Sequence, residues 1–175
     1  MRYILIKQFA KIKLLALILL VSFLSVQAQN KDYINNHKVI AKVLAERYGI
    51  PAPVILAVAA VESAGGTGPV ARVLHNHFGI EGENSFVNQR GHSSRYKQYP
   101  NVFASYLDFC KLITHKRFYH KLKGKDDIKA WVAAISHAGY SEQPEEWTQK
   151  VLGVLSTFRM QSFKILPSPS LASAK

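Results

Sequence analysis

The chain has 175 residues, the length of one ordinary domain, and its single cysteine, Cys110, excludes an internal disulfide framework. With 48% hydrophobic residues it is not a disordered polyelectrolyte. Its 23 basic residues against 11 acidic ones give a net charge of +12, which favours polyanionic partners such as wall polymers, lipopolysaccharide or nucleic acid outside the cell.

Residues 1–28 have the pattern of a secretory signal peptide. An apolar run over residues 14–24 is followed by small residues up to Ala28, and it is preceded by four basic residues, Arg2, Lys7, Lys11 and Lys13. The run is about half the length that a membrane-spanning helix needs. We therefore expect export through the Sec route, cleavage after Ala28 and no stable membrane span afterwards, with an uncleaved anchor as the alternative. Removal of this segment would leave a net charge of +8.

The next two segments predict helices over residues 33–48 and 53–63, separated by a break rich in glycine and proline. The second helix reads Val, Ile, Leu and Ala without interruption from residue 54 to residue 61, so it should be buried on nearly all sides. Glu62 is its only ionisable group. Burial disfavours the charged form, so we expect Glu62 to hold its proton near neutrality, as a general acid must. The alternative is an exposed Glu in a helix-ending turn.

After a short helix over residues 70–75, the pattern changes. Residues 78–99 alternate polar, turn-forming clusters with short apolar pieces, which predicts a small irregular lobe with at most a β-hairpin. Helical patterns resume over residues 102–114 and 116–122. The first of these places Cys110 on one face with four apolar residues, which predicts a buried thiol. The four are Phe103, Tyr106, Phe109 and Ile113.

Two more helices complete the predicted domain. Asp126 or Asp127 should cap a helix that ends near Gly139, where a left-handed residue is expected. The last helix runs from Pro144 to about residue 158, and residues 161–175, rich in Ser, Pro, Ala and Lys, are expected to be disordered. The predicted fold class is therefore mostly α, a helical α+β domain over residues 29–160 with a small lobe flanking a substrate cleft.

Several segments in this order resemble the bacterial glucosaminidase family, the FlgJ-type and autolysin-type peptidoglycan hydrolases of lysozyme-like fold. The resemblance covers about residues 47–158. Each segment by itself is weak evidence for the family, but their occurrence in the same order is strong evidence. The segments are Tyr48-Gly-Ile-Pro51, then residues 55–63, His75-Asn-His-Phe-Gly-Ile80, Arg95-Tyr-Lys-Gln-Tyr99, residues 105–108, residues 117–119, and Ala138-Gly-Tyr140 with Pro144. The resemblance implies a mannosyl-glycoprotein endo-beta-N-acetylglucosaminidase-like domain that cleaves the glycan strands of peptidoglycan.

The resemblance also implies roles for individual residues. Glu62 would protonate the leaving glycosidic oxygen, and Tyr140 would position a water or the acetamido group of the sugar. A purely structural Tyr140, bonded to the backbone, is the alternative. Asn76 would bind the acetamido group and Phe78 would offer an apolar face to a sugar ring. Four more residues are expected along the cleft: Ser63, His77, Tyr96 and Trp147. A place in the core is the alternative for His77 and for Trp147, which lies on a helical stripe.

The sequence departs from the family around the acid and in the lobe. Residues 63–68 read Ser-Ala-Gly-Gly-Thr-Gly, where Ser-Gly-x-Gly is common. A conventional glycosidase uses two carboxylates, about 5–5.5 Å apart if retaining and about 6.5–9.5 Å apart if inverting. The only acids in the lobe are Glu81 and Glu83, of which Glu83, further into the loop, is preferred as a second catalytic residue. Substrate assistance by the N-acetyl group, steadied by Tyr140, is the alternative.

Other chemistries find less support in the sequence. His75 and His77 could chelate, but no His-Glu-x-x-His motif or third ligand accompanies them, so neither a metal nor another cofactor is expected. There is no Gly-x-Ser-x-Gly elbow for a serine hydrolase. The lysines between residues 111 and 125 resemble a nucleic-acid patch, but export favours anionic wall or outer-membrane polymers over nucleic acid.

The sequence therefore predicts an exported endo-β-N-acetylglucosaminidase of peptidoglycan, with periplasmic or extracellular action at the cell wall. A muramidase or a lytic transglycosylase on the same polymer is one alternative. A non-catalytic wall-binding scaffold is another, favoured by the altered glycines beside Glu62 and opposed by the presence of Glu62 itself. No oligomeric state is predicted.

Overall fold

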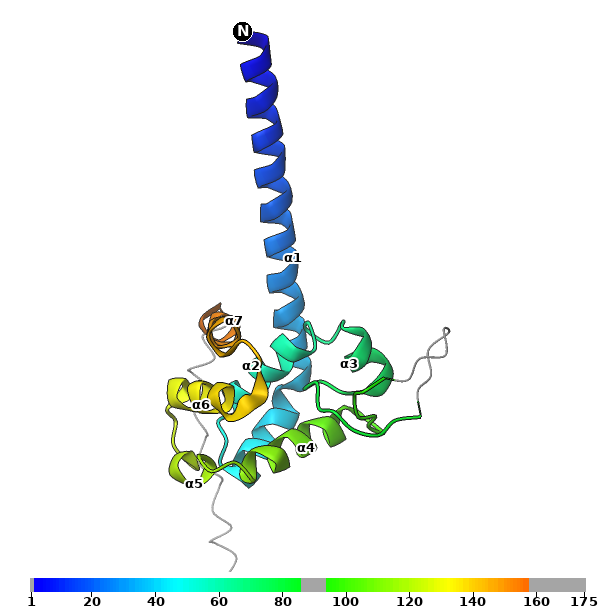
Figure 1. The fold of residues 1–175 in the computed structure, drawn as a ribbon, viewed down its shortest axis with the longest axis vertical. Coiled ribbons are helices and arrows are strands. Elements are labelled where there is room, and N and C mark those ends of the chain that lie inside the picture. The colour runs from blue at the N-terminus through cyan, green and yellow to red at the C-terminus, as the bar shows by residue number, and fades with distance from the viewer. Residues whose placement is uncertain (1, 86–93, 158–175) are drawn as a thin grey trace, which may run out of the picture.

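A computed structural model describes residues 2–85 and 94–157 and is mostly helical, as predicted (Figure 1). The chain folds around α2, which crosses the middle of the domain and is contacted by α1, α4, α6 and α7. The elements, in order, are α1 (Arg2–Tyr48), α2 (Ala52–Glu62), α3 (Pro69–Leu74), α4 (Val102–Thr114), α5 (Tyr119–Leu122), α6 (Ile128–Ile135), the π-helical turn η1 (Ser136–Tyr140) and α7 (Pro144–Thr157). The predicted C-terminal tail lies outside the described residues.

Helix α1 is much longer than the predicted helix over residues 33–48. It runs from Arg2 to Tyr48 without a break, because this stretch contains neither glycine nor proline. Its N-terminal half projects away from the other helices in Figure 1, and its buried residues lie between Tyr33 and Ala45. Across the described part of the chain, no helix has the length and apolar character needed to cross a membrane.

Helix α2 is the buried helix that the sequence predicts. Every residue from Ala52 to Ala60 is buried, with Pro51 at the N-cap and Pro53 in the first turn. The helix ends at Glu62, and the chain then enters the left-handed region at Ala64, Gly65 and Gly66. The glycine cluster therefore ends the helix as expected, and it leaves the only acid of α2 at the edge of the core.

The altered turn after the acid stores backbone strain at Ala64. Its φ of +49° is costly for a residue with a Cβ, by roughly 1–2 kcal/mol. We expect Ala64→Gly to raise the free energy of unfolding by about 0.5–1 kcal/mol, since glycine relieves this strain but adds freedom to the unfolded chain. Urea unfolding should measure it. The same change at right-handed, buried Ala60 should instead destabilise by about 1 kcal/mol or more, and equal effects at the two sites would contradict the strain at Ala64.

The C-terminal helices agree with the prediction in most respects. Cys110 is fully buried in α4, whereas Phe103, expected on the same face, is 41% exposed because it lies in the first turn, beyond the edge of the core. Asp127 caps α6 by accepting a hydrogen bond from the Ala130 amide at 3.0 Å. Gly139 has the expected left-handed conformation, with φ +80°, inside η1.

The lobe between α3 and α4 contains less β-structure than predicted. Among its described residues there is no strand, and one isolated antiparallel bridge joins Glu81 to Tyr96. Side-chain bonds supplement the pairing: the Asn84 amide donates to the carbonyls of Ser94 and Tyr96, at 2.6 and 2.7 Å. Backbone hydrogen bonds also cross the lobe: the amides of Gly82 and Lys97 donate to the carbonyls of Arg95 and Ile80, at 3.0 and 2.9 Å. Residues 86–93 lie outside the described part.

Candidate active site

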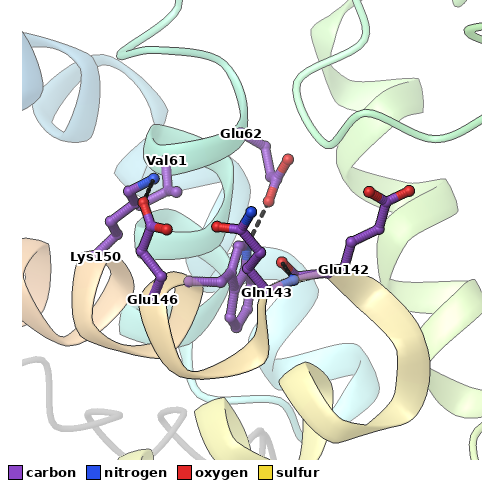
Figure 2. Close-up of a pocket in the computed structure, with 8 residues that line it drawn as sticks. Val61, Glu62, Glu142, Gln143, Glu146 and Lys150 are labelled. Atoms are coloured by element: carbon purple, nitrogen blue, oxygen red, sulfur yellow. Dashed lines mark hydrogen bonds and ion pairs between the residues drawn. The ribbon is translucent and has the colours of Figure 1, made fainter.

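Glu62 ends α2 with its carboxyl group between the helical core and the lobe. The indole Nε1–H of Trp147, from α7, donates a hydrogen bond of 2.5 Å to Oε1 (Figure 2). Burial raises the pKa of Glu62, while the Trp147 hydrogen bond and the positive charge of Lys150 act in the opposite direction. The net shift is upward, as the sequence predicts, so the carboxyl group is prepared to hold a proton.

The two oxygens of Glu62 have different surroundings. Oε1 accepts from Trp147, so in the protonated acid Oε2 carries the proton. Oε2 faces Gly79, where an added Cβ would lie 3.4 Å from Oε2 and 4.0 Å from the ring of Tyr96. Gly79 has φ +65°, so its backbone conformation favours glycine. The proton is therefore directed toward the lobe.

A pocket of about 410 Å³ opens beside Glu62 (Figure 2). Most of its wall comes from the connection before α7 and from α7 itself. From this part of the chain, the sequence-based prediction had named only Tyr140 and Trp147 as site residues. Figure 2 places Glu142 on the other side of Glu62 from the paired side chains of Glu146 and Lys150, whose charged atoms are 2.7 Å apart. The lining residues are Val61, Glu62, Ser141, Glu142, Gln143, Glu146, Trp147 and Lys150.

Tyr140 contacts the site through its ring and its hydroxyl. Its hydroxyl donates to the carbonyl oxygen of Phe78 at 2.6 Å, and its ring lies 5.6 Å from that of Trp147. Burial raises the pKa of Tyr140 well above the usual value, and the charge of Glu62 raises it further, so the phenol stays protonated. Tyr140 thus makes the backbone hydrogen bond expected of a structural tyrosine, and it lies next to Trp147, the residue that binds Glu62.

Asn76 and Phe78 are buried beneath the surface rather than exposed to a sugar. The Asn76 amide donates to the carbonyls of Ile80 and Lys97, both at 2.8 Å, and its oxygen accepts from the amides of Phe78 and Ile80. Phe78 stacks on Phe109 at 4.2 Å and is 2% exposed. Both residues therefore shape the loop that carries Gly79. The sequence predicted that they contact a sugar, but neither side chain is exposed to one in this structure.

His77 and Ser63 support the turn behind the acid. The buried His77 ring bonds through Nδ1 to the hydroxyl of Tyr33 at 2.7 Å, and burial lowers its pKa to about 4, so it is neutral. The hydroxyl of Ser63 accepts from the amide of Gly66 at 2.8 Å. A Cβ at Gly66 would lie 2.8 Å from the Tyr33 ring, so α1 packs directly against this turn. Tyr33 has no role in the sequence-based prediction.

Tyr96 and two charged residues form one cluster in the lobe. The guanidinium of Arg95 lies over the Tyr96 ring, 5.3 Å from its centroid, and pairs with Glu81 at 3.3 Å. The pKa of Arg95 is raised first by its hydrogen bond to Tyr96 and then by the charges of Glu81 and of Glu142. The charge of Glu142, which lies in the connection before α7, therefore acts on a residue of the lobe.

Glu83, the preferred second carboxylate, is not brought to the pocket of Glu62. It is exposed and lines a separate hollow with residues 84, 85 and 98–100. Its backbone carbonyl accepts from the amide of Gln98 at 3.2 Å, which fixes that part of the lobe. In the described parts of the chain, no group of three or more His, Cys, Asp or Glu side chains is arranged to hold a metal ion.

The structure thus places a partly buried carboxylic acid at a helix end, beside an open pocket and a small lobe, and carboxyl groups are the groups through which glycoside hydrolases act. The sequence model of the family Glucosaminidase, described as mannosyl-glycoprotein endo-beta-N-acetylglucosaminidase, matches residues 38–160. The chain belongs to this family, and the resemblance stated from the sequence is confirmed.

Known proteins with related sequences and folds agree with this assignment. The peptidoglycan hydrolase FlgJ of Salmonella typhimurium is 24% identical in an alignment of 154 residues that covers 78% of this chain and 48% of FlgJ, so the chain spans about half of that relative. The glycoside hydrolase domain of the same FlgJ has a similar fold, with a TM-score of 0.62, 22% identity and coverage of 76% and 90%. The catalytic domain of the autolysin Auto from Listeria monocytogenes has a TM-score of 0.63, 18% identity and coverage of 78% and 88%.

Proposed function

We propose that this chain is an exported endo-β-N-acetylglucosaminidase that hydrolyses the glycan strands of peptidoglycan, with Glu62 as the general acid. The observation that carries the proposal is the state of Glu62: burial raises its pKa, and Trp147 leaves Oε2 to carry the proton toward the lobe. Membership of the Glucosaminidase family supports the bond, and the FlgJ and autolysin relatives support the polymer.

In this function the sugar chain lies between the lobe and the start of α7. Glu62 gives its proton to the leaving glycosidic oxygen, and the neutral Tyr140 holds Phe78 and Trp147, which position the acid. Tyr96, beside Oε2, contacts a sugar ring. The basic surface of the secreted chain favours retention at an anionic wall or outer-membrane polymer.

Product analysis tests the bond that is cleaved. Residues 29–175 should be incubated with purified peptidoglycan, and the new chain ends identified by mass spectrometry after borohydride reduction. Reduced N-acetylglucosamine ends are expected, and Glu62→Gln serves as the control for contaminating hydrolases. Reduced N-acetylmuramic acid ends or 1,6-anhydro ends would contradict the proposal in favour of a muramidase or a lytic transglycosylase. Binding to the wall without any new ends would contradict it in favour of a scaffold.

A further inference from the structure

The carboxylates available to assist Glu62 can be counted completely, because all 11 acidic residues of the chain lie within the described residues. Besides Glu62, only two line its pocket, Glu142 and Glu146. Glu146 is paired with Lys150 at 2.7 Å. Glu83 lines a different hollow, and Asp108 binds Lys97 and Tyr99. Glu142 is therefore the pocket carboxylate with no salt bridge within 4 Å among the described residues.

Glu142 lies where a second catalytic group is useful. It is exposed in the connection between η1 and α7, and Figure 2 shows its side chain away from the Glu146–Lys150 pair. Its charge acts on Arg95, whose guanidinium lies over Tyr96, and Tyr96 adjoins the same glycine as Oε2 of Glu62. Glu142 thus lines the pocket of Glu62, and Tyr96 of the lobe lies near Oε2 on the side of Gly79.

The connection that carries Glu142 is fixed on both sides. Before it, the Tyr140 hydroxyl is bonded to the carbonyl of Phe78, and after it, Trp147 is bonded to Glu62. Between them the Ser136 hydroxyl donates to the carbonyl of Pro144 at 2.8 Å, and the Gln143 amide donates to the Ser141 hydroxyl at 3.1 Å. A catalytic side chain on a backbone held in this way keeps its place relative to the acid.

We propose that Glu142, and not an acid of the lobe, is the second catalytic carboxylate of this enzyme, acting as the general base. This rests on the proposed glucosaminidase function. The Glu142 carboxylate accepts a proton from water, whose oxygen forms a bond to the anomeric carbon. The glycosidic bond breaks at the same carbon, and Glu62 gives its proton to the leaving oxygen. The next turnover needs only the return of the proton from Glu142 to Glu62 through solvent. Attack from the side opposite the leaving group inverts the anomeric centre.

The test compares Glu142→Gln with Glu145→Gln, a neighbouring exposed acid that does not line the pocket. Glu142→Gln should slow the formation of reducing ends on peptidoglycan by about 10²-fold or more, the usual contribution of general base catalysis. Glu145→Gln should stay within about twofold of the unmutated enzyme. Because both side chains are exposed, both variants should unfold at the unmutated temperature, which excludes a folding defect.

Chemical rescue and product stereochemistry give readouts that a structural role would not move. Azide should restore cleavage by Glu142→Ala, with formation of an α-glycosyl azide, and the unmutated enzyme should release the α-anomer first. If Glu142→Gln kept activity within a few-fold of normal while Glu62→Gln was inactive, the proposed role of Glu142 would be overturned and the glucosaminidase proposal would stand. A β-anomer as first product would overturn it in favour of a retaining or substrate-assisted reaction. Absence of N-acetylglucosamine ends with the unmutated enzyme would overturn both proposals.

Discussion

Glu62→Gln is expected to lower the rate of glycan cleavage by about 10³-fold or more and to leave the fold intact. An amide has nearly the shape of the acid, and its oxygen can still accept the hydrogen bond from Trp147. It cannot, however, deliver a proton to the leaving oxygen, and general acid catalysis contributes about 10²–10⁴-fold. Release of reducing ends from purified peptidoglycan measures the loss.

Thermal unfolding separates this loss from a loss of structure. Glu62 lies at the end of a buried helix, and burial disfavours its charged form, so a neutral amide should preserve or slightly raise the free energy of unfolding. Glu145→Gln is the matched control, since it makes the same chemical change on the surface of α7. If Glu62→Gln cleaved peptidoglycan at an undiminished rate, Glu62 could not be the acid.

The position of Glu62 could be predicted from the sequence because the signal is local. An apolar run of about two turns of helix, one acid and a glycine cluster follow one another between residues 54 and 66. Each has a physical consequence that does not depend on the rest of the chain. The burial of Cys110 followed from the same kind of periodicity. The exposure of Phe103 did not follow, because periodicity gives the face of a helix but not where the core ends along its axis.

The partners of Glu62 could not be predicted in the same way, since they depend on tertiary packing. Trp147 is 85 residues further along the chain, and a Trp on a helical stripe has the same pattern whether or not its indole nitrogen meets a carboxylate. Glu142 lies in a short connection without periodicity, so only the folded structure brings it to the pocket. The family resemblance predicted that Asn76 binds the acetamido group of a sugar, whereas its four backbone hydrogen bonds could be known only from the folded loop.

Trp147→Phe is expected to lower kcat/KM by about 10- to 10²-fold and to move the alkaline limb of the pH–rate profile to higher pH. The loss of rate follows because the indole N–H fixes the orientation of the acid, and small misplacements of a catalytic group are costly. Glu62 must be protonated to act, so activity falls as the pH rises through its pKa. The Trp147 hydrogen bond favours the charged carboxylate and so lowers that pKa; without it, the pKa rises further and the acid stays protonated to higher pH.

Trp131→Phe is the control for this experiment. Trp131 is also buried, and its indole N–H donates to the backbone carbonyl of Lys125 at 3.0 Å, so both variants lose one indole hydrogen bond and a similar volume. Only Trp147 touches Glu62. A lower stability is therefore expected for both variants, but a displaced alkaline limb for Trp147→Phe alone. If the two profiles kept the limb of the unmutated enzyme, Trp147 would be a packing residue, and burial by the surrounding core would be the sole cause of the raised pKa of Glu62.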